Sequence, residues 1–131
     1  MATIKSFTSL EQSRKLAEIL PLESADAFYP WRELMKDYDS IYVPEKMLMS
    51  DIEENDILAW SLAALLEQLP YELCDDDGNS SYLQINKEDD VYQLVSTDPY
   101  GDFESIETNR YNHFVDACYE LILKLYELNL L

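Results

Sequence analysis

Residues 59–74 read AWSLAALLEQLPYELC, and the spacing of the apolar residues changes at Pro70. Before the proline, apolar residues recur at helical spacing, which predicts a helix ending there; they are Ile57, Leu58, Leu62, Leu65, Leu66 and Leu69. This helix begins either near 51–55 or after Ser61, which would cap it with Trp60 and Leu65 packed across its first turn. After the proline the spacing becomes two, which is typical of strands.

The residues after Pro70 predict a β-meander. Four short segments rich in Tyr, Val, Ile and Leu are separated by clusters of turn-forming residues; they are 71–74, 81–86, 91–96 and 103–107. The turns between them are expected at 75–80, 87–90 and 98–102. Because consecutive strands joined by short turns pair antiparallel, we expect a small antiparallel sheet.

Helices are predicted on both sides of this central region. The first covers 9–20, with Thr8 and Glu11 at capping-box spacing and Pro21 closing it. The last runs from about 113 to 128, capped by Asn109 or Asn112. Its apolar stripe consists of Phe114, Val115, Cys118, Leu121, Ile122, Leu125 and Leu128.

Residues 21–50 give the weakest pattern, because Pro21, Pro30 and Pro44 interrupt it. We favour short strands at 25–31 and 40–43 over a helical turn that begins at Pro30. Together the elements predict an α+β fold in which N-terminal, central and C-terminal helices pack mainly on one face of the meander. With 131 residues, 47% of them hydrophobic, we expect residues 1–131 to form a single folded domain.

The negative charge is concentrated in the middle of the chain. The whole chain has a net charge of −18, and residues 51–107 hold 16 acids and one base, Lys87. A field of this sign slows encounters with DNA, RNA and anionic lipid and speeds those with basic proteins. We therefore expect no direct nucleic-acid binding and a basic protein as the possible partner.

The N-terminus and the cysteines indicate a cytoplasmic location. The N-terminus has no apolar run of signal-peptide length, and no stretch of the chain approaches the roughly 20 apolar residues of a membrane span, so we expect no membrane association. The two cysteines, Cys74 and Cys118, form no CxxC pair. Reduced thiols are the interpretation that fits this pattern.

Three blocks resemble a known family. They are TSLEQSRKLAEILPLESAD (8–26), AWSLAALLEQLP (59–70) and VDACYELILKLYELNLL (115–131). They are similar to segments of an uncharacterised family of small acidic proteins that recurs in the chromosomes and mobile elements of intestinal anaerobic bacteria. The family commonly has proline where this chain has Phe114, so the start of the last helix can differ. The resemblance implies a cellular context and no activity.

The aspartate run at 75–77 matches a calcium loop only in part. With Gly78 at the sixth position of the EF-hand pattern, Asp75 and Asp77 fit, but Leu73 and Gln84 occupy the first and twelfth positions, where acids are needed. A hairpin turn at Asp77–Gly78 explains the stretch better.

The histidine and cysteines, which often act in catalysis, do not form a recognisable catalytic set. His113 and Cys118 are five positions apart, which directs them to different sides of a helix. Loops that bind phosphate are typically rich in glycine, and the chain has only two glycines. We expect no cofactor and lean towards a non-enzymatic protein.

Tyrosines interleaved with acids suggest an interaction surface. The candidate residues are Asp75, Asp76, Asp77, Tyr82, Glu88, Asp89, Asp90 and Tyr92. Our preferred hypothesis is a non-catalytic module that binds a basic partner. The alternatives are an inhibitor that mimics nucleic acid, which needs carboxylates ordered along one face, and a metal-assisted hydrolase with Asp and Glu ligands.

Overall fold

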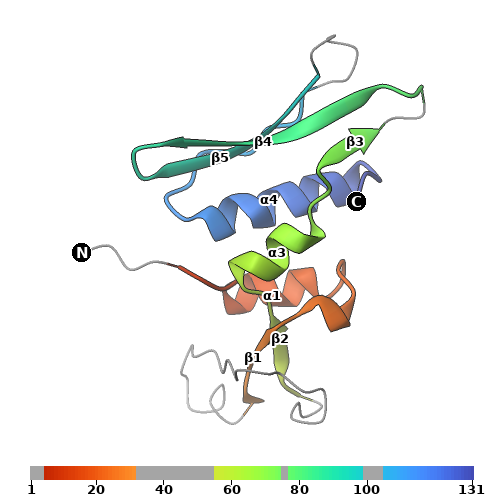
Figure 1. Cartoon of the computed structure of the whole chain (residues 1–131). Coiled ribbons are helices and arrows are strands. Elements are labelled where there is room, and N and C mark those ends of the chain that lie inside the picture. Colours follow the sequence, from red (N-terminus) through yellow and green to blue (C-terminus); the bar gives the residue numbers. More distant parts are fainter. Residues whose placement is uncertain (1–4, 32–54, 75–76, 99–104) are drawn as a thin grey trace. The chain divides into compact units, whose positions relative to one another are not determined.

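A computed structural model describes residues 5–31, 55–74, 77–98 and 105–131 (Figure 1). The chain divides into two compact units. The N-terminal unit comprises residues 6–65, and the C-terminal unit comprises residues 66–131 together with 1–5. That residues 1–131 form a single domain stays a prediction.

The N-terminal unit combines a short helix with a two-stranded sheet. Helix α1 (Leu10–Leu16) is followed by the 3-10 helix η1 (Leu22–Ser24) and strand β1 (Ala27–Tyr29). Strand β1 pairs antiparallel with β2 (Ile57–Ala59), and α1 contacts β2. The expected strand at 25–31 is thus confirmed as the shorter β1, whereas the one at 40–43 lies outside the described residues.

Helix α1 is capped one residue later than its sequence suggests. Ser9, not Thr8, is the N-cap, and its hydroxyl accepts a hydrogen bond from the Gln12 N–H at 3.2 Å. The Gln12 side chain in turn accepts from the Ser9 N–H at 2.9 Å. Thr8 is buried and bonds elsewhere, so the prediction of a Thr8 and Glu11 box is wrong by one position.

The central helix begins after Ser61, which is one of the two starts expected from the sequence. Helix α3 spans Leu62–Gln68, and the Ser61 hydroxyl accepts a hydrogen bond from the Ala64 N–H at 3.2 Å. Ile57 and Leu58, which fit the helical spacing, belong to strand β2 instead. The earlier start near 51–55 is therefore wrong, because the backbone of 57–59 is paired with β1.

Thr8 and Trp60 join the start of the N-terminal unit to the end of its sheet. The Thr8 N–H donates to the Trp60 carbonyl at 2.9 Å, and the Trp60 N–H donates to the Thr8 hydroxyl at 3.1 Å. The Tyr29 hydroxyl donates to the Thr8 carbonyl, and the Trp60 indole N–H donates to the Ser24 hydroxyl. Trp60 is fully buried, so these bonds satisfy polar groups that water does not reach.

The C-terminal unit contains the predicted meander. Strands β3 (Glu72–Cys74), β4 (Ser80–Glu88) and β5 (Val91–Thr97) form one antiparallel sheet in that order. Residues 105–111 return along the other side of β5 through bridges between Val95 and Glu107 and between Tyr92 and Tyr111. The predicted strand at 103–107 lies partly outside the described residues, and its described part forms the single bridge at Glu107.

Helix α4 (Phe114–Glu127) covers one face of this sheet and contacts β5 (Figure 1). The predicted stripe is confirmed for the buried residues Val115, Cys118, Leu121, Ile122 and Leu125. Leu128 is 53% exposed, because the helix has ended before it. The N-cap is His113, which makes no side-chain cap bond, so the expected Asn109 or Asn112 cap is wrong.

The α+β class is confirmed, with two small sheets where a single meander was expected. Helix α4 packs on the three-stranded sheet, and α1 packs on the two-stranded one. In the described part of the chain, no helix has the length and apolar character needed to cross a membrane.

Candidate functional site

The aspartates at 75–77 adjoin the turn between β3 and β4. Asp75 and Asp76 lie outside the described residues. Asp77 is exposed and directly precedes Gly78, whose φ of +83° is the left-handed conformation that glycine tolerates best. This geometry agrees with the expected hairpin turn.

The second acidic group occupies the turn between β4 and β5. Glu88 pairs with Val91, so Asp89 and Asp90 alone form the loop. The expected turn at 87–90 is therefore wrong by two residues, because Lys87 and Glu88 pair within the sheet. Asp89 has a φ of 52°, a left-handed conformation that Asp adopts more readily than most residues. The carboxylates of Glu88, Asp89 and Asp90 are all exposed, and we call these three residues the acidic hairpin.

The two acidic groups lie at opposite ends of β4. This strand has nine residues, and a strand rises about 3.3 Å per residue, so the two turns are separated by roughly 30 Å. The residues proposed as one candidate surface therefore do not gather in one place. Asp77 is remote from the acidic hairpin.

The two candidate tyrosines lie on opposite faces of the sheet. Tyr82 is paired with Thr97, and Tyr92 is paired with Lys87. Residues 82 and 87 of one strand differ by an odd number, so their side chains point to opposite faces. Tyr92 lies on the face covered by α4, and its ring meets that of Phe114 edge-on at 5.2 Å.

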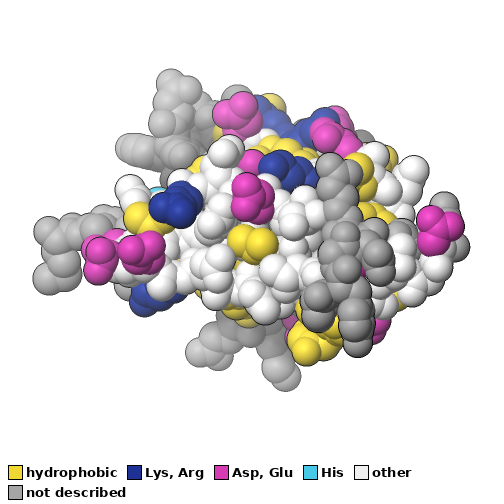
Figure 2. Space-filling view, turned by 90° about the horizontal axis from the view of Figure 1, so that it is seen from above, with side chains coloured by type: hydrophobic (Ala, Val, Ile, Leu, Met, Phe, Trp, Pro, Cys, Tyr) yellow, Lys and Arg dark blue, Asp and Glu magenta, His cyan; other side chains and the backbone are white. Residues whose placement is uncertain are grey.

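The outer face of the sheet, opposite α4, is largely uncharged in its middle. Its central side chains come from two pairs of residues, Gln84 with Val95 and Asn86 with Gln93, and the exposed Glu107 lies beside Val95. Figure 2, seen from above the sheet of Figure 1, shows mostly white, uncharged surface there, with magenta acidic groups scattered and mostly towards the margins. Among the described residues, the outer face thus has no continuous row of carboxylates.

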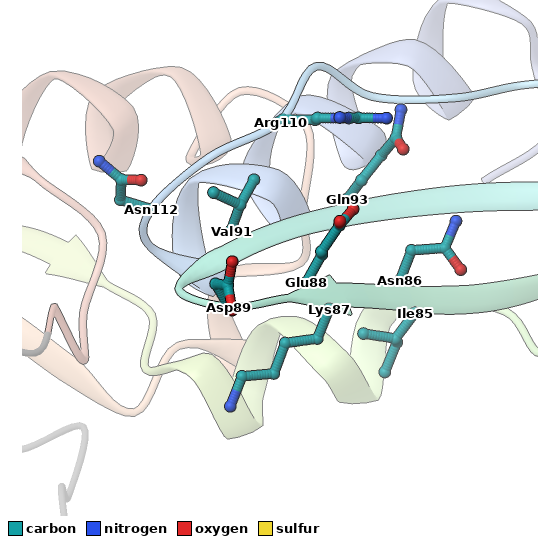
Figure 3. Close-up of a pocket in the computed structure, with 9 residues that line it drawn as sticks. All are labelled: Ile85, Asn86, Lys87, Glu88, Asp89, Val91, Gln93, Arg110 and Asn112. Carbon is teal, nitrogen blue, oxygen red and sulfur yellow. The ribbon is translucent and has the colours of Figure 1, made fainter.

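A surface hollow of about 820 Å³ lies at the acidic hairpin (Figure 3). It is lined by Ile85, Asn86, Lys87, Glu88, Asp89, Val91, Gln93, Arg110 and Asn112. The side chains of Asn86, Glu88 and Gln93 point to one side of the hairpin, whereas Ile85 and Lys87 point to the other (Figure 3). The hollow therefore follows the end of the hairpin and offers carboxylates, carboxamides and two bases.

Arg110, Gln93 and Asn112 were not among the candidates from sequence. Arg110 is exposed and comes from the segment that returns along β5, and its side chain lies beside Gln93 (Figure 3). The expected turn at 87–90 would pair Asn86 with Val91, so the observed pairing of Asn86 with Gln93 was not predicted. The position of Arg110 was not readable, because it depends on the bridge between Tyr92 and Tyr111.

Neither Cys118 nor His113 lines this hollow. Burial raises the pKa of the Cys118 thiol to about 12, so it stays protonated at neutral pH. His113 sits at the start of α4 as its N-cap. No cluster of three or more His, Cys, Asp or Glu side chains suited to a metal ion occurs within 5–31, 55–74, 77–98 and 105–131.

Comparison of the chain with protein-family models, with curated proteins and with solved structures gives no match. The resemblance to the small acidic family therefore stays a prediction, and it assigns no residue of the hollow a role.

Proposed function

We propose that the protein is a non-catalytic interaction module of the cytoplasm that binds a basic protein partner through the acidic hairpin. The observation that carries the proposal is the exposure of Glu88, Asp89 and Asp90 at one strand end beside a hollow. Lys87 is the single base in the sequence from 51 to 107, which has a net charge of −15. Electrostatic attraction of this kind raises the rate at which a basic partner arrives.

The chemistry of the hollow supports recognition of a peptide. Carboxylates accept charge-assisted hydrogen bonds from lysine and arginine, and the carboxamides of Asn86 and Gln93 both donate and accept. Arg110 adds a donor that can bind a carbonyl or carboxylate of the same partner.

Mimicry of nucleic acid receives less support from the arrangement of the acids. That alternative needs carboxylates at regular spacing along one face. The described acids at this face, which are Glu72, Glu107 and the acidic hairpin, are separated by uncharged side chains of β4 and β5. The hydrolase alternative has no described residues to support it.

The proposal is tested by affinity capture with three baits at low and at moderate salt. The first is the unaltered chain, and the second is the hairpin variant with Glu88→Gln, Asp89→Asn and Asp90→Asn. Asparagine tolerates the positive φ at position 89, so the turn is preserved. The third is a control with Glu11→Gln, Glu23→Gln and Glu127→Gln, which removes three exposed charges elsewhere.

We expect a basic protein to be retained by the unaltered chain and the control at low salt and to be lost from the hairpin variant. Moderate salt should release it, because salt screens exposed charges. Equal capture by all three baits, or capture that is indifferent to salt, would contradict the proposal.

A further inference from the structure

Among the described residues, one edge of strand β4 is paired along only part of its length. Strand β3 pairs with residues 80–82, and the Leu83 N–H donates to the Tyr71 carbonyl at 3.1 Å. From Gln84 to Glu88, the only described strand beside β4 is β5. Five residues of β4 therefore present one edge without a neighbouring strand in the described part of the chain.

The backbone groups at this edge can be assigned from the hydrogen bond of Leu83. Alternate residues of a strand direct their N–H and C=O groups to the same side. Because Leu83 donates away from β5, Ile85 and Lys87 also direct their N–H and C=O groups away from β5. Neither residue makes a backbone hydrogen bond to another described residue on that side.

The side chains leave this backbone accessible. The Ile85 side chain is exposed (55% of the residue), so an apolar contact is available next to the edge. The Lys87 amine lies 5.4 Å from the centre of the Tyr92 ring, on the face of the sheet that α4 covers. Lysine often blocks sheet edges, but this side chain is directed across the face instead.

We propose that the edge of β4 at Ile85 and Lys87 accepts an extended segment of a basic protein as an additional strand. This inference rests on the proposed function and names how the partner is held. Two residues of the incoming strand would exchange up to four backbone hydrogen bonds with Ile85 and Lys87. Its basic side chains would then lie near Glu88 and Asp89, where the edge reaches the acidic hairpin.

The charge of the chain selects this occupant over a second copy. Each copy carries −18, and antiparallel pairing of two β4 edges would bring together two chains of the same sign. A basic strand instead gains attraction at the hairpin end of the edge. Strand addition also uses backbone groups common to all sequences, so the acidic hairpin supplies the preference for basic partners.

The test uses a synthetic heptapeptide of alternating lysine and valine and two N-methylated forms. One form is methylated at every valine and the other at every lysine, so both keep the charge of the parent. In an extended peptide only one of these two sets of N–H groups faces a given strand. Amide hydrogen exchange of Ile85 and Lys87 is measured in the free chain and with each peptide.

We expect fast exchange at Ile85 and Lys87 in the free chain and slow exchange at Gln84 and Asn86, which pair with β5. The parent peptide should protect Ile85 and Lys87. One methylated form should bind roughly tenfold more weakly or worse without protecting them, because it lacks the donors for the edge. The other should bind like the parent.

Equal, salt-sensitive binding of all three peptides without protection would overturn strand addition and leave the proposed function intact. No binding of any peptide at low salt would overturn both. Protection that appears without peptide as the protein concentration rises would place a second copy on the edge and would also overturn the inference.

Discussion

Tyr82 and Tyr92 lie on opposite faces of the three-stranded sheet, although both were candidates for one interaction surface. Tyr82 faces outward and is 36% exposed, and its ring lies 5.7 Å from that of Tyr71. Tyr92 packs edge-on against Phe114 at the start of α4. One tyrosine is thus available to a partner, and the other holds the helix on the sheet.

Replacing each of these two tyrosines should destabilise the protein to a different extent. Tyr92→Ala removes the ring contact with Phe114 and should lower the free energy of unfolding by about 2–4 kcal/mol. Tyr82→Ala should cost less than about 1.5 kcal/mol, because its ring is partly solvated already. Urea denaturation followed by circular dichroism gives both values, and equal losses would contradict the assignment of faces.

Thr8→Val should destabilise the N-terminal unit although valine has nearly the same shape. The change leaves the Trp60 N–H without its acceptor, and it removes the 2.7 Å bond between the hydroxyls of Thr8 and Ser13. A buried polar group left unpaired costs about 1–3 kcal/mol. Urea denaturation followed by tryptophan fluorescence measures the loss.

Ser6→Ala is the matched control for this experiment. Ser6 is exposed and contributes its backbone carbonyl, which alanine also has, to a bond from the Leu62 N–H. Its replacement should change the free energy of unfolding by less than about 0.5 kcal/mol. A comparable loss from both variants would show that the Thr8 hydroxyl has no special role.

The Cys118 thiol should make stability fall at high pH. Burial raises its pKa from 9.0 to about 12 in the folded chain, so the unfolded chain releases this proton first. Between pH 9 and 12 the free energy of unfolding should therefore fall, by up to about 1.4 kcal/mol per pH unit from this group. Cys118→Ala should be less stable at pH 7 and show a flatter decline. Parallel pH profiles of the two proteins would exclude this contribution.

The two thiols should differ sharply in reactivity. Cys74 is exposed and Cys118 is fully buried. A disulfide reagent at pH 8 should modify one thiol per chain promptly and the second only when denaturant is added. Cys74→Ser should abolish the prompt reaction. Prompt modification of two thiols in the folded chain would contradict the packing of α4.

The sequence predicted the helices and strands whose apolar spacing reflects which of their own side chains are buried. Helix α4 has six residues buried along one side, and the alternation expected at 81–86 and 91–96 lies within β4 and β5. Ile57 and Leu58 also matched a helical period, but pairing with β1 holds them in a strand. The conformation of Ile57 and Leu58 is set by pairing with residues distant in the sequence, and local apolar spacing does not predict such pairing.

The candidate site was predictable only in part for a similar reason. The acids of the hairpin were recognisable from composition, and their turn from the neighbouring strands. The opposite faces of Tyr82 and Tyr92 depend on a register that one residue of slippage would invert. Arg110 lines the hollow because the neighbouring Tyr111 forms a bridge with Tyr92, which is 19 positions earlier in the sequence. No local sequence motif predicts this bridge.

The central claim is that the acidic hairpin is where a basic partner binds, and amide chemical shifts measured during a titration test it most directly. The lysine and valine heptapeptide is added to the isotopically labelled chain at low salt, with the hairpin variant as the comparison. We predict that the largest changes fall within 84–91 and disappear in the variant. Changes confined to the N-terminal unit or to the turn at Gly78, or unaltered in the variant, would contradict the claim.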